Sequence, residues 1–430
     1  VALQRRAIES RAAREASSAR GHRDAATRLS LGEMYAELGR YQWAGGELEG
    51  AVDSMERALG IMPDGPSRIR ARAQASLAQH LMLAGRFDES AQVAEDARTT
   101  AVAAAALGED TLAERGHATC TLGVDAAYLG DLDRGLELLE EASAIARRAG
   151  RLDDLMRAAA NRTTLLDLDS RREDALAVVQ TFLADAEAGG LAASYGAFLR
   201  GNAADILYHL GRWQEAEAEC RAALGWRMSA LEAEWWPPLV LGLLLTESRG
   251  DEEAGRLVGK AILQLETVPA GQWSGHMLRA EVSLALGSGD ADGALAIAER
   301  EWPRSLASDE LFVIAWSAAT CLEAAAAAAE HGRANSDPGL IARARALSNR
   351  IVPEAELQIS HSSFGPGLGA RREAELWLAT ARAHGDRVIG ESDPETWAEL
   401  AAAWGRLSMP HRQAKALWWQ ALAILAAATE

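Results

Sequence analysis

The sequence predicts an all-α solenoid of stacked antiparallel helical hairpins. Glycines recur 39 to 46 residues apart, with one gap of 81 residues that equals about two units, and a period in this range is typical of helical repeat arrays. Alanine and leucine dominate while aromatic residues make up 5%, which favours helix over strand. We therefore expect no sheet. The recurring glycines are Gly39, Gly85, Gly130, Gly211, Gly250 and Gly289.

Small residues around these glycines resemble the tetratricopeptide pattern, in which they let the two helices of a hairpin approach closely. The second unit matches with Leu77, Ala78, Leu81, Gly85, Phe87, Ser90, Ala94 and Ala97. The third matches with Leu122, Gly123, Ala126, Gly130, Leu132, Gly135, Leu139 and Ala142. The fifth matches with Ala203, Ala204, Leu207, Gly211, Trp213, Ala216, Cys220 and Ala223. We predict a tetratricopeptide-like α-solenoid, that is, a right-handed superhelix of antiparallel helix hairpins.

The other units fit this pattern less closely. In the first unit the back half follows Gly39 only after an insertion, which we expect to lengthen the turn between its helices. The fourth unit carries Ser170 in the turn position in place of glycine. The units around Gly250 and Gly289 are looser still.

The predicted domain organisation follows from these units. We expect about eight hairpins over residues 1–358, the first one truncated, then a Gly/Ser/Pro loop at 359–369 and further hairpins over 370–430 that continue the array. A second loop is expected at Val268–Gly275. Residues Leu3–Ala19 read as a second helix without its partner and Ala421–Ala428 as an uncapped apolar helix, so we expect the chain to be part of a longer protein.

Charge and composition limit the classes of partner. A formal net charge of −18 argues against a nucleic-acid-binding surface. The longest apolar run, Pro237–Leu245, is much shorter than the ~20 residues that cross a bilayer, and we expect a cytoplasmic protein without a membrane partner. Cys120, Cys220 and Cys321 show no paired spacing and read as buried thiols.

Three segments resemble the repeat region of large ATP-binding LuxR-type (STAND-like) transcriptional regulators and of related cyclase-ATPase proteins. They are LGVDAAYLGDLDRGLELLEEASAIARRAG (Leu122–Gly150), SYGAFLRGNAADILYHLGRWQEAEAECRAAL (Ser194–Leu224) and DPETWAELAAAWGRLSMPHRQAKALWWQALAIL (Asp393–Leu425). The resemblance covers essentially the whole chain. It rests on short stretches of similar sequence and on their order along the chain. It implies a sensor and autoinhibitory region placed between a nucleotide-binding module and a DNA-binding helix-turn-helix.

Neither flanking module lies in this chain, since no G-x-x-x-x-G-K-[ST] loop occurs and no basic helix-turn-helix follows Leu425. We therefore expect a non-catalytic region without a cofactor. Its partners would be an effector in the concave groove (a peptide, protein or small molecule) and the flanking ATPase and DNA-binding modules. The alternative is an independent tetratricopeptide scaffold that binds a short peptide of a partner protein.

The resemblance to tetratricopeptide repeats places the first helix of each hairpin at the concave groove. One inward position then gives a polar column of Ser30, Ser76, Thr121, Asn161 and Asn202. The carboxamides are the strongest candidates because they both donate and accept hydrogen bonds and are poor helix-interior residues. Other inward residues are Arg72, Gln79, His117, Arg157, Thr164, Asp205, Tyr208 and His209. Alternatively, these side chains bond to one another or to water.

Tryptophans concentrate in the second half of the chain, where twelve of the thirteen lie at or after Trp213. The cluster Trp235–Pro238 could form an aromatic platform for a ligand, or fill wide seams between helices. Packing is favoured because Trp213, Trp397, Trp404 and Trp418 fall at packing positions of the repeat.

Other chemical motifs are weak. Gly365, Gly367 and Gly369 superficially resemble a dinucleotide-binding loop, but no strand precedes them and a connector is favoured. The nine histidines include no pair at i and i+4, so no metal site is expected. No serine or cysteine lies in a recognisable nucleophile motif, so no catalytic residue is expected.

Overall fold

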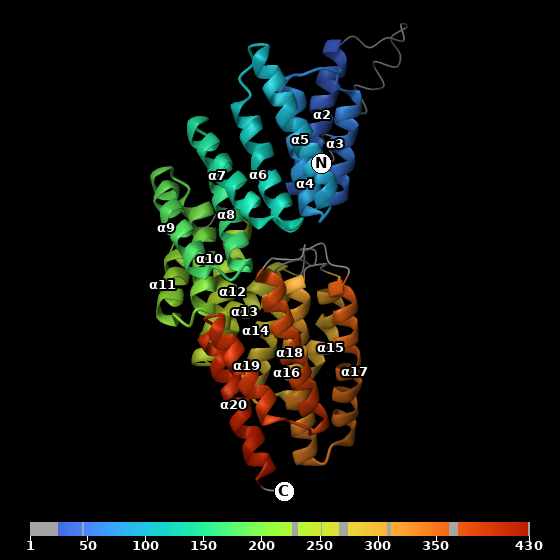
Figure 1. The fold of residues 1–430 in the computed structure, drawn as a ribbon, viewed down its shortest axis with the longest axis vertical. Coiled ribbons are helices and arrows are strands. Elements are labelled where there is room, and N and C mark those ends of the chain that lie inside the picture. The colour runs from blue at the N-terminus through green and yellow to red at the C-terminus, as the bar shows by residue number, and fades with distance from the viewer. Residues whose placement is uncertain are drawn as a thin grey trace. The chain divides into compact units, whose positions relative to one another are not determined.

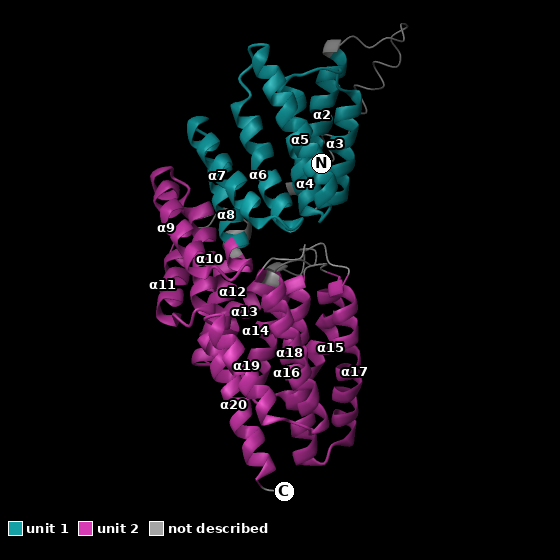
Figure 2. Ribbon diagram, viewed as in Figure 1, with its two compact units in different colours: residues 1–165 teal, residues 166–430 magenta. Residues whose placement is uncertain are grey.

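The structure is a computed structural model, and it describes residues 25–44, 47–225, 231–250, 252–265, 274–307, 311–360 and 369–428. Within these ranges the chain forms nineteen α-helices, one short π-helix and no strand (Figure 1). The prediction of an all-α chain is thus confirmed for the described residues. The chain divides into two compact units, Val1–Leu165 and Leu166–Glu430 (Figure 2).

Unit 1 consists of three antiparallel hairpins followed by most of a seventh helix. The two helices of each hairpin pack together, and the first helices of successive hairpins also pack against one another. Its helices are α2 (Ala25–Ala44), α3 (Leu48–Ile61), α4 (Arg68–Leu83), α5 (Phe87–Ala106), α6 (Leu112–Tyr128), α7 (Leu132–Arg148) and α8 (Leu152–Leu168), the last of which crosses the unit boundary.

Unit 2 repeats this arrangement, since α10, α12, α14 and α16 pack in series and each also packs against the helix that follows it. A further helix, α18, packs along α16, and α19 and α20 form the final hairpin. Its helices are α9 (Arg172–Ala188), η1 (Ala192–Gly196), α10 (Ala197–His209), α11 (Trp213–Leu224), α12 (Leu231–Ser248), α13 (Glu252–Leu265), α14 (Ser274–Gly287), α15 (Ala291–Leu306), α16 (Leu311–Asn335), α17 (Pro338–Ser360), α18 (Gly369–Ile389), α19 (Pro394–Arg406) and α20 (Pro410–Ala427).

Turn glycines separate the helices at five of the six predicted positions. Gly85, Gly130, Gly211, Gly250 and Gly289 all have positive φ, a conformation that glycine adopts without steric cost. The amide of Gly85 donates to the carbonyl of Met82 at 3.0 Å and the next amide, of Arg86, donates to Leu81 at 2.9 Å. This is the Schellman arrangement, which satisfies the last carbonyls of a helix.

Ser170 takes the turn position of the fourth unit, as the sequence predicts. Its φ is 61°, which is unfavourable for a residue with a Cβ. The amide of Ser170 donates to Asp167 at 2.8 Å, which repeats the glycine turn, and its hydroxyl donates to Glu373 of α18 at 3.1 Å. Two hydrogen bonds therefore hold this strained residue.

Gly39 does not end a helix, so this prediction is wrong. It lies inside α2, which continues to Ala44. A Cβ at Gly39 would lie 3.0 Å from the carbonyl oxygen of Ala51 and 3.1 Å from Cγ of Met55, so the glycine is needed for close packing on α3. The insertion in the first unit thus lengthens the first helix rather than the turn, because nothing between Gly39 and Ala44 interrupts helix formation.

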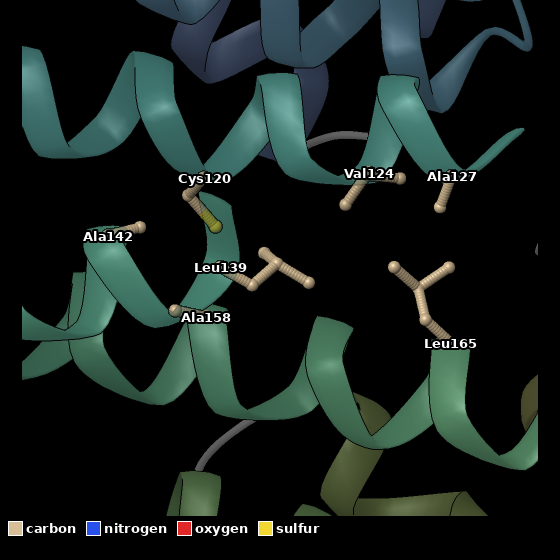
Figure 3. Packing of buried hydrophobic residues seen from close by; sticks show 7 residues of the cluster. All are labelled: Cys120, Val124, Ala127, Leu139, Ala142, Ala158 and Leu165. Carbon is tan, nitrogen blue, oxygen red and sulfur yellow. The ribbon is translucent and has the colours of Figure 1, made fainter. Parts of the chain in front are cut away.

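The small residues of the third unit allow α6 and α7 to approach closely, as predicted. A Cβ on Gly135 would lie 2.6 Å from the carbonyl oxygen of Gly123 and 2.9 Å from Cβ of Ala127. Between α6, α7 and α8 the core contains small and branched side chains that point toward one another (Figure 3). These are Cys120, Val124, Ala127, Leu139, Ala142, Ala158 and Leu165.

In the part of the chain that the structure describes, one helix, α16, is long and apolar enough to span a membrane by length and composition. Sequence inspection overlooks it because Ser, Thr and Glu interrupt its apolar run. Inside the protein, 89% of its apolar window is buried, which is the situation of a core helix. The three cysteines are free and buried, as expected.

Three expectations lie wholly or largely outside the described residues. They are the helix at Leu3–Ala19, the loop at Val268–Gly275 and the loop at 359–369 that holds Gly365 and Gly367. The helices that border the last loop end at Ser360 and begin at Gly369.

Candidate functional site

Unit 1 contains a groove along the first helices of its hairpins. The larger of two cavities has a volume of about 320 Å³, and a neighbouring cavity of about 120 Å³ shares Arg40, Arg72 and Ser76 with it. The shared walls make the two cavities one elongated depression, which we call the unit 1 groove. The larger cavity is lined by Arg40, Trp43, Arg68, Arg72, Ala75, Ser76, Gln79, His80, Ala113, Glu114, His117, Arg151 and Asp154.

Two of the arginines in the unit 1 groove pair with its acidic residues. Arg68 Nε donates to Glu114 at 2.9 Å, and Arg151 Nε donates to Asp154 at 3.4 Å. Arg72 is exposed between the two cavities and, among the described residues, has no ion pair or hydrogen bond. Across both cavities the four arginines are balanced by Glu33, Glu37, Glu114 and Asp154, but in the larger cavity four guanidinium groups face two carboxylates. Arg72 is free to bind an anion there.

An aromatic surface lies beside these charges. Trp43 is 44% exposed and stacks on His80, with 6.1 Å between the ring centroids and 27° between the planes. Burial, with a smaller effect of His117, lowers the pKa of His80 to about 4, so this ring is neutral at neutral pH. The groove therefore offers an apolar face next to a free cation.

His117 connects the groove to the next helix of unit 1. Burial and the neighbouring Arg157 lower the pKa of His117 to about 4, so its 3.4 Å contact with Asp154 joins a neutral ring to a carboxylate. Arg157 donates to the carbonyl of His117 at 2.8 Å and to the hydroxyl of Thr121 at 3.4 Å. Arg157 and Thr121 thus bond within the protein, and Thr121 is fully buried.

The two asparagines favoured by the sequence also have partners inside the protein. Asn161 is half-buried and its amide donates to Cys120 Sγ at 3.5 Å. Asn202, in unit 2, accepts a hydrogen bond of 2.9 Å from the indole of Trp236. Neither asparagine lines the unit 1 groove. Each asparagine thus bonds to a side chain outside the predicted groove set, Cys120 and Trp236 respectively.

The remaining predicted groove residues are buried in unit 2. Asp205, Tyr208 and His209 are each less than 10% exposed. The hydroxyl of Tyr208 donates to Glu247 at 2.6 Å, and Arg412 donates to the same hydroxyl at 2.7 Å. These three residues therefore do not face an open groove.

Helix α20 covers this face of unit 2. His411 Nε2 lies 2.8 Å from Glu247, and Lys415 forms an ion pair with Glu323 of α16. Arg279 of α14 pairs with both of these glutamates. Although burial by itself raises the pKa of Glu247, the attraction of Arg279, Arg412 and His411 holds it well below its usual value.

Among the tryptophans of unit 2 that the structure describes, Trp418 is exposed and the others are buried or half-buried. Trp235 and Trp236 are 3% and 2% exposed inside α12, which favours packing over a ligand platform. Trp397 and Trp404 are also buried, whereas Trp418 is 61% exposed, so its predicted packing position is wrong. Its neighbour Trp419 packs instead, with the Arg387 guanidinium 3.4 Å from its ring centroid.

Sequence reasoning found four groove residues that the structure brings together, Arg72, Ser76, Gln79 and His117. It missed the aromatic wall of Trp43 and His80 and the ion pairs with Glu114 and Asp154. The sequence signal that could have identified Trp43 is its position, far from the other twelve tryptophans. Neither Ser30 nor Thr164 lines the groove.

A scan of protein-family models finds no match, and no curated protein matches the sequence. Among solved structures, a Rap conjugation gene regulator of plasmid pLS20 in complex with the Phr* peptide aligns at 12% identity and TM-score 0.42, over 81% of this chain and 80% of that one. A Rap protein complexed with competence and sporulation factor aligns at 9% and 0.42, over 84% and 99%. Tetratricopeptide-like repeats of a kinesin light chain protein from Podospora anserina align at 18% and 0.36, over 46% and 94%.

Scores this low carry no argument about ligands. The chain is an all-α array of tetratricopeptide-like hairpins by its own features, namely paired antiparallel helices, glycine turns and close contacts between small residues.

Proposed function

We propose that unit 1 binds a short segment of a partner protein in its groove, and that this segment carries a carboxylate next to an apolar side chain. The observation on which this depends is the elongated depression in which Arg72 has no partner among the described residues and Trp43 is exposed beside it. A cavity of about 320 Å³ falls within the range of ligand sites, and its extension fits a chain better than a compact molecule.

The larger cavity of the groove favours an acidic segment, because four arginines line it against two carboxylates. Arg40, Arg68 and Arg151 are held by neighbouring carboxylates, so they fix the shape of the site, while Arg72 is left to pair with the ligand. A carboxylate bound by a guanidinium forms a charge-assisted hydrogen bond, which is stronger than a neutral one. Gln79 adds a carboxamide that can bond to a peptide backbone.

In the wider protein, we propose that this chain is the non-catalytic, cytoplasmic sensor region of a LuxR-type ATPase transcriptional regulator. The support is the resemblance of three segments of the sequence, and the groove gives that region a place to bind an effector. A sensor must bind its effector more tightly in one conformation than in another, because equal affinity shifts no equilibrium. The second candidate, a free-standing adaptor, needs only the groove.

Selection of peptides from a random phage-displayed library on the intact chain tests the binding proposal. We expect enrichment of acidic peptides that contain an aromatic or aliphatic residue. Arg72→Ala should weaken a selected peptide at least about tenfold, because it removes a hydrogen bond to a charged group. Arg98→Ala is the matched control, since Arg98 lies on α5 and pairs with Glu95. No enrichment, or equal loss in both variants, contradicts the proposal.

Hydrogen exchange with a selected peptide separates the two candidate roles. A sensor region should show changed protection in helices beyond those that line the groove, because its effector shifts a conformational equilibrium. Protection confined to α2, α4, α6 and α8 supports the adaptor instead.

A further inference from the structure

Three buried side chains of unit 2 bring metal-binding atoms together. Asp205 and His209 lie one turn apart on α10 and share a face of that helix. His276 comes from α14, and its Nε2 lies 3.2 Å and 3.3 Å from the two carboxylate oxygens of Asp205. One potential ligand atom from each residue lies within 4.8 Å of the other two.

Among the residues that the structure describes, the His209 ring has no hydrogen bond that accounts for its place in this cluster. It is only 4% exposed, its Nδ1 is buried without a partner, and its Nε2 is 3.8 Å from Asp205 Oδ1, too far for a hydrogen bond. Burying an unpaired polar group is costly. Because zinc ligands stand 2.0–2.1 Å from the ion, tetrahedral neighbours are about 3.4 Å apart. Asp205 Oδ1 lies 3.2 Å from His276 Nε2 and 3.8 Å from His209 Nε2, and the three ligand atoms all lie within 4.8 Å of one another.

The charges around the cluster favour a cation. Arg172 of α9 donates to Glu373 of α18 at 2.7 Å, and its Nε lies 3.0 Å from Asp167 of α8. Together with Asp205, these groups comprise three carboxyl groups and one guanidinium. Burial raises the pKa of Asp167 to about 7, so this carboxyl is only partly ionised at neutral pH. With Asp205 and Glu373 ionised and the imidazoles neutral, as metal ligands must be, the formal charge lies between one and two negative, and an uncompensated buried charge is unfavourable.

We propose that Asp205, His209 and His276 bind a divalent transition-metal ion of the zinc class, which ties α10 to α14 across α12. Imidazole nitrogen with carboxylate oxygen is a donor set that suits zinc and its neighbours in the first transition row. The site is independent of the unit 1 groove. It is a structural site that stabilises unit 2 by binding its folded form.

The competing arrangement needs no metal. In it, His276 and Asp205 hydrogen-bond directly, and both imidazoles pack edge-on against Trp316 at centroid distances of 4.5 Å for His276 and 5.9 Å for His209. The two arrangements differ in whether the chain takes up zinc at one equivalent.

Metal titration of the full chain after removal of bound metal by a chelator distinguishes them. We expect Zn²⁺ to bind at one equivalent by calorimetry and Co²⁺ to give visible absorption bands that saturate at one equivalent. Loss of an outer-shell partner typically weakens metal binding 10–100-fold, so loss of a direct ligand in His209→Gln or His276→Gln should weaken it by about 100-fold or more. His331→Gln, on the exposed surface of α16, should change nothing.

A second measurement keeps the test valid if a variant folds poorly. In the unaltered chain, Zn²⁺ should raise the unfolding midpoint followed by tryptophan fluorescence and increase hydrogen-exchange protection in α10 and α14. The proposal is overturned if the unaltered chain binds no zinc, or if well-folded His209→Gln and Asp205→Asn bind it as tightly as the unaltered chain does.

Discussion

In unit 1 the first helices of the hairpins border a groove of about 320 Å³, whereas in unit 2 side chains of α20 bond to α10, α12 and α16. The space that remains between α20 and α14, α16, α18 and α19 is only about 20 Å³. Both units are built from the same hairpin with the same glycine turns. The repeat therefore aligns the first helices of the hairpins on one face of each unit. It does not determine whether that face stays open or is covered by another helix. Polar side chains face an open groove in one unit and bind the chain's own helix in the other.

The ion pairs of the two faces also differ in burial. Ion pairs of the unit 1 groove have at least one exposed member, as in Arg68 with Glu114, whereas Arg279, Glu247 and Glu323 are all buried in unit 2. Exposed pairs contribute little to stability, while a buried charge that loses its partner costs several kcal/mol. The covered face of unit 2 should therefore be far more sensitive to charge removal than the open face of unit 1.

The largest expected effect comes from Glu247→Ala in unit 2. The change leaves Arg412 and part of the Arg279 guanidinium buried without an anion, and should destabilise unit 2 by about 3–5 kcal/mol. Urea unfolding followed by tryptophan fluorescence measures this, because twelve of the thirteen tryptophans lie in unit 2.

Glu217→Ala is the control for that measurement. Glu217, on α11, also binds two arginines, at 2.8 and 3.0 Å, but it is half-buried and both arginines are exposed. It should cost at most about 1 kcal/mol. Equal losses for the two glutamates would show that burial does not distinguish these ion-pair networks.

The second effect is a pH dependence of unit 1. Burial raises the pKa of Asp125 from an ordinary value near 3.8 to about 8. Between about pH 4 and 8 the folded form then holds a proton that the unfolded form has lost, so stability falls as pH rises, by up to about 1.4 kcal/mol per pH unit. In this proton-bound state the carboxyl can donate to Ser90 Oγ, 2.7 Å away, while that hydroxyl donates to the carbonyl of Ala78.

Asp125→Asn removes this titration, so its stability should vary less with pH than that of the unaltered chain between pH 5 and 8. Hydrogen exchange of peptides from α6 and α7 reports on unit 1 alone. If stability changed with pH equally in both proteins, Asp125 would have to be ionised in the folded state.

The third effect concerns the close packing of unit 1. Gly135→Ala places a methyl group 2.6 Å from the carbonyl oxygen of Gly123, so the helices must separate, at a cost of about 1–3 kcal/mol. Gly60→Ala on α3 meets no atom within 4 Å and should stabilise by up to about 1 kcal/mol through helix propensity. Hydrogen exchange in α3, α6 and α7 reports both changes. We expect Gly135→Ala to destabilise unit 1 and Gly60→Ala to stabilise it.

The smallest effect tests how α20 is oriented on unit 2. Trp419→Ala removes the ring that packs against Arg387 and His384 and should cost about 1–2 kcal/mol. Trp418→Ala removes an exposed ring and should change stability by less than about 0.5 kcal/mol. Thermal unfolding followed by circular dichroism compares them. A larger loss for Trp418 would place the other face of α20 against unit 2.

Much of the fold could be predicted because its signals are local. A glycine followed by a charged residue ends a helix wherever the chain needs positive φ, and Ser170 was found because its neighbours kept the spacing of the repeat. The prediction that Gly39 ends a helix was wrong because a glycine inside a helix and a glycine at its end look alike in sequence. Only contact with α3 distinguishes them.

The candidate site could be predicted only in part. Repeat position alone brought Arg72, Ser76, Gln79 and His117 to one face, since successive hairpins stack in register. The same rule also selected Asp205 and Tyr208, which are buried and bond to His276 of α14 and Arg412 of α20. Position within a repeat tells which way a side chain points, but not what covers it.

The sequence by itself determined that this protein is a series of helical hairpins, since helix propensity, turn glycines and small packing residues act over a few positions. The tertiary structure alone decided that unit 1 keeps an open groove, that α20 covers the face of unit 2, and that His276 meets Asp205 from 71 residues away. Such contacts depend on the path of the whole chain, so no local pattern encodes them.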